Sequence, residues 1–258
     1  MLLAIDVGNT HTVLGIYDGA RLVHDFRIES QRGRTADEHL VLLLGLLGYA
    51  GVSRTAVTAS IMASVVPALT EPITEAVRRA FAHDTVLVGP GIKTGMPILY
   101  ENPREVGADR IVNSVAAFER VKGGVVVVDF STATTFDCIS PKGEYLGGVI
   151  APGILIGAEA LFTRAARLSR VPITKPPRVV GKNTTSAMQS GIVLGYVGLV
   201  DGLVRRIVEE LAFPCRVLAT GSLASPVAEE CETIDEVVPD LTLEGLRMLY
   251  ERNAGVGA

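Results

Sequence analysis

The chain has 258 residues, enough for two domains of roughly 120 residues with separate hydrophobic cores. Its net charge is −4, only 5% of its residues are aromatic and it has no Trp, which argues against binding nucleic acid or a membrane surface. Its three cysteines are widely spaced, no signal peptide opens the chain, and its longest apolar stretch, residues 191–200, is too short to span a bilayer. We therefore expect a cytoplasmic protein.

The first half of the chain alternates strands and helices. Its predicted elements are strands at 2–6, 12–17 and 22–28, a helix at 36–49, a strand at 56–64, a helix from Pro67 to about Ala82 and a strand at 85–88. Residues 89–103 hold three Pro and three Gly, and we interpret them as an active-site loop rather than a domain linker.

The second half repeats this plan. We expect a helix at 105–120, a strand near 124–130 with a second hairpin, and a helix that residues 147–153 enter and that runs through Leu168. The remaining predicted elements are a loop at 170–181, a helix at 186–211 and a strand–helix–strand–helix ending over 216–220, 227–231, 236–238 and 243–253. This alternation predicts an α/β fold of two lobes, at residues 1–118 and 119–258.

The most informative pattern occurs once in each half. An apolar run meets an acid and then a turn of small and hydroxyl residues, first after Asp6 and again after Asp129. Backbone N–H groups in such turns can bind phosphates, and the carboxylate can hold a cation. One copy alone could be an ordinary β-turn, but the duplication favours a nucleotide held in a cleft between two lobes.

Two further segments each have both a structural and a functional interpretation. Asp109 and Arg110 open a helix, where they are either a solvated ion pair or a base that accepts a hydroxyl proton beside a cation that holds an anion. The turn at residues 220–224 contains Gly221, whose lack of a side chain could admit a flat adenine. Alone, that turn is a weak signal.

Together these segments resemble type III pantothenate kinase over essentially the whole chain. The matching segments are residues 6–10, 64–67, 107–110, 129–135, 147–153, 181–184 and 240–243. The resemblance implies the fold of the acetate and sugar kinase, heat-shock protein 70 and actin superfamily, with two ribonuclease-H-like lobes and a central cleft. The implied reaction is ATP-dependent phosphorylation of pantothenate, the first step towards coenzyme A.

The resemblance also implies roles for individual residues. The first phosphate loop would consist of Asp6, Val7, Gly8, Asn9, Thr10, His11, Thr12 and Val13, with Asp6 near the Mg²⁺ that accompanies ATP. Thr132 would contact ATP, and Asp129 would bind a monovalent cation, K⁺ or NH₄⁺. The pantothenate site would include Tyr100, Gly107, Ala108, Asp109, Arg110 and Thr184. Asp109 would accept the proton, and Thr184 would reach the site from the other subunit of a homodimer.

One position departs from the family pattern. Ser131 stands where the family usually has Gly, which would strain a backbone of positive φ by about 1–2 kcal/mol. We expect Ser131 to tune ATP affinity without abolishing turnover. Three other functions stay open: a sugar or acyl-acid kinase or polyphosphate phosphatase on the same scaffold, a nucleotide-binding regulatory protein without kinase turnover, and an actin-type structural ATPase.

Overall fold

The computed structural model describes residues 1–165, 168–222 and 224–254, and the chain forms two compact units. Unit 1 contains Met1–Met96, Glu101–Ala116 and the chain from Leu241 onward, whereas unit 2 contains Pro97–Tyr100 and Ala117–Asp240. The break after Ala116 lies close to the expected one after residue 118. The C-terminal helix α7 (Leu241–Asn253) differs from expectation because it packs on β1 and β4 of unit 1.

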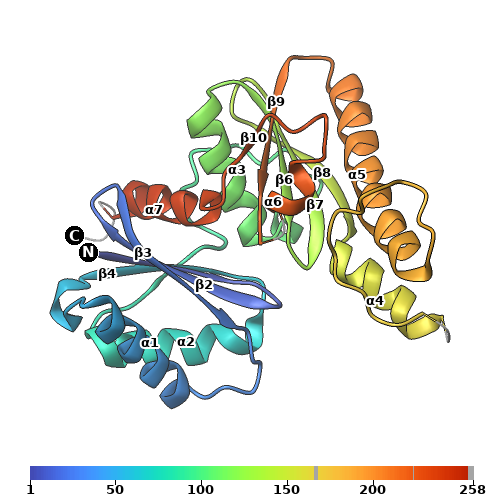
Figure 1. The fold of residues 1–258 in the computed structure, drawn as a ribbon. Helices are drawn as coiled ribbons and strands as arrows, with labels where there is room; N and C mark the ends of the chain where they lie inside the picture. The colour runs from blue at the N-terminus through green and yellow to red at the C-terminus, as the bar shows by residue number, and fades with distance from the viewer. Residues whose placement is uncertain (166–167, 223, 255–258) are drawn as a thin grey trace. The chain divides into compact units, whose positions relative to one another are not determined.

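Unit 1 is a five-stranded sheet with helices on both faces (Figure 1). Its strands are β1 (Leu2–Val7), β2 (His11–Asp18), β3 (Arg21–Glu29), β4 (Ala59–Ser64) and β5 (Val86–Leu87), in the order β3-β2-β1-β4-β5. β1 pairs antiparallel with β2 and parallel with β4. Helices α1 (Ala36–Ala50) and α2 (Pro67–Phe81) cover one face, and α7 packs on the other.

The side-chain period of two assigns each residue of β1 to a face. Leu3, Ile5 and Val7 enter the core beneath α1 and α2. Asp6 therefore points to the opposite face, where Leu243 of α7 closes on Gly15 of β2. A Cβ on Gly15 would lie 2.9 Å from Leu243 Cδ1, so this glycine lets α7 approach the sheet.

Local sequence signals explain the helix ends of unit 1. Thr35 and Glu38 form a capping box at the start of α1, and Gly51 ends it in the left-handed conformation. Pro67 occupies the first turn of α2 as predicted, since its missing N–H costs nothing there. The strand expected from residue 56 begins only at Ala59, because a short 3₁₀ helix, Arg54–Ala56, precedes it.

Unit 2 repeats the strand order of unit 1. Its strands are β6 (Gly124–Phe130), β7 (Ala133–Ile139), β8 (Tyr145–Pro152), β9 (Cys215–Thr220) and β10 (Glu236–Val237), in the order β10-β9-β6-β7-β8. β6 pairs antiparallel with β7 and parallel with β9, as β1 does with β2 and β4. The predicted α/β fold of two ribonuclease-H-like lobes is thus confirmed by two sheets of one topology.

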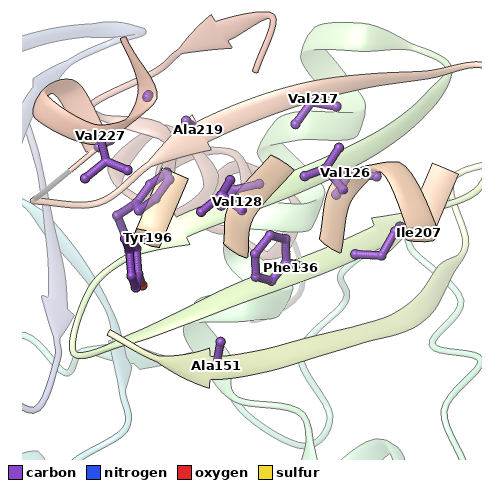
Figure 2. Close-up of a cluster of buried hydrophobic side chains, with 14 of the residues drawn as sticks. Val126, Val128, Phe136, Ala151, Tyr196, Ile207, Val217, Ala219 and Val227 are labelled. Atoms are coloured by element: carbon purple, nitrogen blue, oxygen red, sulfur yellow. The ribbon is translucent and has the colours of Figure 1, made fainter. Parts of the chain in front are cut away.

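A long helix provides the core of unit 2. Tyr196, Val200 and Val204 of α5 (Thr184–Leu211) pack on β6, β7 and β9, as Figure 2 shows for Tyr196 beside Val128. The remaining helices are α3 (Ala108–Val121), which begins in unit 1 and ends in unit 2, α4 (Ile154–Arg164) and α6 (Ala224–Ala228). Within the described ranges, no helix is long and apolar enough to cross a membrane.

Two sequence predictions for unit 2 are wrong in detail. Residues 147–152 do not lead directly into a helix but belong to β8, because they pair with β7 through Pro152. The helix that follows ends at Arg164 rather than Leu168. The predicted helix at 227–231 instead spans Ala224–Ala228. Periodicity alone could not separate these short apolar runs.

Candidate functional site

The first predicted phosphate loop is a tight turn between β1 and β2. The Gly8 N–H donates to the His11 carbonyl at 3.0 Å, and a Cβ on Gly8 would lie 3.0 Å from that same oxygen. Asn9 and Thr10 are exposed at the tip, where their backbone can meet a ligand. Backbone N–H groups in a tight, exposed turn of this kind can bind a phosphate.

Not every residue of this segment presents its side chain to a ligand. The Thr12 side chain is buried, and its hydroxyl is 2.8 Å from the Ser30 hydroxyl. Val7 is fully buried in the core beneath α1 and α2. The Thr12 hydroxyl therefore lies in the core rather than at the tip of the turn, because alternation along β2 places it on the same face as its partner Val7. Asp6 and Val13 pair on the opposite face.

Sequence reasoning missed the residues that support this loop. The Ser30 N–H donates to the Thr10 carbonyl at 2.9 Å, and Arg32 Nη2 donates to Asn9 Oδ1 at 3.3 Å. A guanidinium thus lies beside a turn that is expected to bind anions. The basic segment 32–34 was the available signal, but only the pairing of β2 with β3 brings it to the loop.

The second predicted phosphate loop is stabilised by two hydrogen bonds within its own turn. The Ser131 N–H donates to the Ala133 carbonyl at 3.1 Å, and the Ser131 hydroxyl donates to the same oxygen at 3.2 Å. Ser131 is not among the residues of positive φ, so the departure from Gly introduces no backbone strain of that kind. A Cβ on Gly153 would lie 2.2 Å from the Thr132 carbonyl oxygen, which explains the glycine at the end of β8.

Asp129 is the counterpart of Asp6 and is the penultimate residue of its strand. It is buried, and a Cβ on Gly221 would lie 2.5 Å from its Oδ1. Thr220 is the neighbour of Asp129 on the parallel strand β9, and its Oγ1 is a buried atom without a hydrogen-bond partner among the described residues. Buried polar atoms are normally paired, so a hydroxyl oxygen of this kind on the strand partner of Asp129 suits a bound cation.

Asp109 and Arg110 open α3 and are not a solvated surface pair. Arg110 is only 7% exposed, and Asp109 is half-buried. The Arg110 N–H donates to Asp109 Oδ1 at 2.8 Å, and a Cβ on Gly107 would lie 2.5 Å from that oxygen. Burial raises the pKa of Asp109, and the Arg110 N–H and charge oppose this shift. A carboxyl with these properties is suited to accept a proton.

The remaining predicted substrate residues lie in unit 2, apart from the Gly107–Arg110 segment of unit 1. Tyr100 packs beside Tyr145, with ring centroids 6.3 Å apart. Thr184 is the first residue of α5 and lies in an apolar groove between α4 and α5, together with Lys182 and Leu161. Asn183 caps this helix by accepting from the Ser186 N–H at 2.8 Å.

The two units together define a class of protein. A central strand with a penultimate acid, flanked by one antiparallel and one parallel neighbour, occurs twice, as in actin-like ATPases. A solved structure from Campylobacter jejuni, assigned to the Baf family of transcriptional activators, aligns with a TM-score of 0.63 at 18% identity and covers 98% of this chain and 100% of that one. A Listeria monocytogenes protein assigned as an N-acetylmannosamine kinase aligns with a TM-score of 0.53 at 9% identity over 98% and 99% of the two chains. These likenesses concern the fold.

The sequence identifies the family. The profile described as type III pantothenate kinase matches residues 2–206. The type III pantothenate kinase of Myxococcus xanthus is 56% identical over 253 residues, which cover 98% of this chain and 99% of the relative. That of Syntrophotalea carbinolica is 55% identical over 255 residues, covering 99% and 100%. The chain belongs to the type III pantothenate kinase family.

Proposed function

We propose that this protein transfers the γ-phosphoryl group of ATP to pantothenate, giving 4′-phosphopantothenate at the first step of coenzyme A biosynthesis. The observation that carries the proposal is membership of the kinase family over nearly the full length of its relatives. The half-buried Asp109 and buried Arg110 at the start of α3 support it, because phosphoryl transfer mainly requires positioned groups and charge.

Asp109 is the proposed general base. It would take the proton from the pantothenate hydroxyl as that oxygen attacks the γ-phosphorus in line. A raised pKa brings the carboxyl closer to the operating pH, where a base is most effective. Arg110 would hold the pantothenate carboxylate, because a planar guanidinium matches that shape. Gly107 keeps the space beside the Asp109 carboxylate open.

The two turns would hold ATP. The backbone of residues 8–11 would bind phosphate oxygens, with Asp6 near the Mg²⁺ that enters with the nucleotide. Thr132 would contact ATP from the second loop. Gly8 and Gly153 support these roles, because a side chain at either position would displace the turn.

Asp129 is the proposed site of a monovalent cation. The buried carboxylate and Thr220 Oγ1, which has no hydrogen-bond partner in the part of the chain that the structure describes, offer oxygen ligands for K⁺ or NH₄⁺. Such a cation would supply positive charge near the phosphates. Asp129 would hold the cation. Gly221, which packs closely against Asp129 and Phe130, would keep the loop in place.

A homodimer in the cytoplasm completes the proposal. Leu155, Ile156 and Leu161 of α4 are exposed beside the groove that contains Thr184, and a second copy of the chain would cover them. Burying large apolar side chains is the main source of stability in permanent dimers. Thr184 would then contact pantothenate bound in the partner subunit.

The decisive experiment measures ADP release by the purified protein with ATP and Mg²⁺. We expect release that depends on pantothenate and increases with K⁺, and mass spectrometry should detect 4′-phosphopantothenate. N-acetylmannosamine, glucose and acetate serve as competing acceptors. Turnover with one of these but not with pantothenate would assign a different kinase activity, whereas nucleotide binding without any turnover would favour the regulatory alternative.

A further inference from the structure

Two backbone hydrogen bonds join the short segment Pro97–Tyr100 to Tyr145 of β8. The Tyr145 N–H donates to the Pro97 carbonyl at 2.9 Å, and the Leu99 N–H donates to the Tyr145 carbonyl at 2.8 Å. The Tyr100 ring lies over the Tyr145 ring at an interplanar angle of 57°. A Cβ on Gly147 would lie 3.5 Å from Tyr100 Cδ2, so the ring also rests against this glycine.

A β-bulge decides where the Tyr145 side chain points. The pairing of β7 with β8 is regular from Ala133↔Pro152 to Cys138↔Gly147 and then shifts, so that Tyr145 lies opposite Ile139. Without this shift Tyr145 would lie opposite Ser140, on the other face of the sheet. Gly147 has a φ of +119°, which permits the shift. The bulge thus brings Tyr145 to the face that carries Asp137.

The Tyr145 side chain is hydrogen-bonded to Asp137 of the neighbouring strand β7. The Tyr145 hydroxyl donates to Asp137 Oδ1 at 2.9 Å, and both residues are fully buried. The Thr135 hydroxyl donates to Asp137 Oδ2 at 3.2 Å, and Thr135 is the cross-strand partner of Asp129. Hydrogen bonds to a buried carboxylate are stronger than those between neutral groups and hold their donors in place.

We propose that Asp137 and Tyr145 are positioning residues for Tyr100, so that a buried tyrosine–carboxylate pair fixes one wall of the acceptor site. The proposal rests on the proposed function, because Tyr100 is there a pantothenate-contacting residue. Asp137 and Tyr145 are both fully buried and so present no surface to an acceptor. Loss of their hydrogen bond loosens the segment that carries Tyr100 and weakens acceptor binding, while the chemistry of phosphoryl transfer at Asp109 is retained.

A spectroscopic test follows the segment directly. The chain has no Trp, so Tyr100→Trp introduces a single indole that reports on this position. Adding Tyr145→Phe to that variant should speed the decay of indole anisotropy and increase quenching by acrylamide. Tyr17→Phe in the same background is the matched control, since Tyr17 is an equally buried tyrosine in unit 1 and should leave the indole signal unchanged.

A kinetic test uses the otherwise unaltered protein. We expect Tyr145→Phe to raise the KM for pantothenate about tenfold, with the KM for ATP and kcat changed by less than about twofold. Asp137→Asn keeps the size of the side chain and an oxygen acceptor for the phenol, so its increase in KM should be smaller. Tyr17→Phe should change none of these constants.

The outcomes separate the two proposals. A wild-type protein that does not phosphorylate pantothenate overturns the proposed function, while the indole signal still tests the positioning. Pantothenate-dependent turnover with unchanged KM and unchanged indole signals in both the Tyr145→Phe and Asp137→Asn variants overturns the positioning role. A lower melting temperature with unchanged KM also overturns it, since the pair would then serve stability alone.

Discussion

The two hairpins share a plan but differ in how their turns are held. Between the pairs Val7↔Thr12 and Phe130↔Thr134, the first turn has residues 8–11 and the second only 131–133. In both, a threonine hydroxyl after the turn is buried in its own core. The Thr12 hydroxyl is hydrogen-bonded to the Ser30 hydroxyl just after β3, whereas the Thr134 hydroxyl is hydrogen-bonded to the Tyr196 hydroxyl of α5.

The surroundings of the two acids differ as well. Residue 64, which follows the parallel neighbour of Asp6, is a serine whose hydroxyl accepts from the Val66 N–H just before α2 begins. Its counterpart in unit 2 is Gly221, whose φ of +96° leaves room for Asp129. The first turn is thus exposed and supported at its edge, whereas the second is fixed by close backbone contacts. We infer that the second turn is the more rigid of the two.

The largest effect should come from removing Asp109 at the start of α3. Asp109→Asn should lower kcat by about 10²- to 10⁴-fold, the usual contribution of a general base. Because burial raises the pKa of Asp109, its ionised form is disfavoured in the folded protein. Protonated Asp109 carries no such penalty. The free energy of unfolding is therefore highest below the pKa of Asp109 in the unfolded chain and decreases as pH rises through its pKa in the folded protein. At neutral pH the melting temperature of Asp109→Asn should therefore rise.

The pH profile provides the check on this assignment. In the wild type, kcat/KM for pantothenate should fall on the acid side with an apparent pKa above the ordinary 3.8 of aspartate. Asp109→Asn measured beside Asp37→Asn, an exposed acid on α1, supplies the comparison. Near-normal turnover by Asp109→Asn would place the base elsewhere.

An intermediate effect is expected from closing the space beside Asp129. Gly221→Ala puts a Cβ 2.5 Å from both Asp129 Oδ1 and the Phe130 carbonyl, on a backbone of positive φ. We expect a loss of about 2–4 kcal/mol of unfolding free energy. Activation by K⁺ should also weaken, as shown by ADP release measured against KCl concentration.

The matched control for that substitution is Gly45→Ala. Gly45 lies in α1 with no atom within 4 Å of its Cβ position. Alanine there should increase stability by about 0.5–1 kcal/mol and leave the response to K⁺ unchanged. If Gly221→Ala keeps both full stability and normal K⁺ activation, the second turn is less constrained than its contacts indicate.

The smallest effect should come from Ser131. Its backbone is not strained, and its hydroxyl is bonded to the Ala133 carbonyl within its own turn. Ser131→Gly should therefore change the KM for ATP by less than about threefold, a free-energy difference below about 0.7 kcal/mol. Steady-state kinetics measure this, and a larger change would give Ser131 a direct role in binding phosphate.

Local patterns along the chain predict the alternation of strands and helices, the duplicated acid-and-turn pattern and the family. These features depend on neighbours along the chain, such as the capping box at Thr35 and the valines before Asp129. Each site residue could be named from its motif, because motifs preserve spacing. The roles proposed for these residues remain predictions that the experiments above address.

The direction in which each side chain points, and the groups that support it, depend on contacts between segments that are distant in the chain. Alternation turned Thr12 into the core, a bulge turned Tyr145 towards Asp137, and α7 joined the sheet of unit 1 from the far end of the chain. Each outcome depends on strand register or packing between distant segments. Such contacts are selected by burial of the whole core, so local sequence patterns do not specify them.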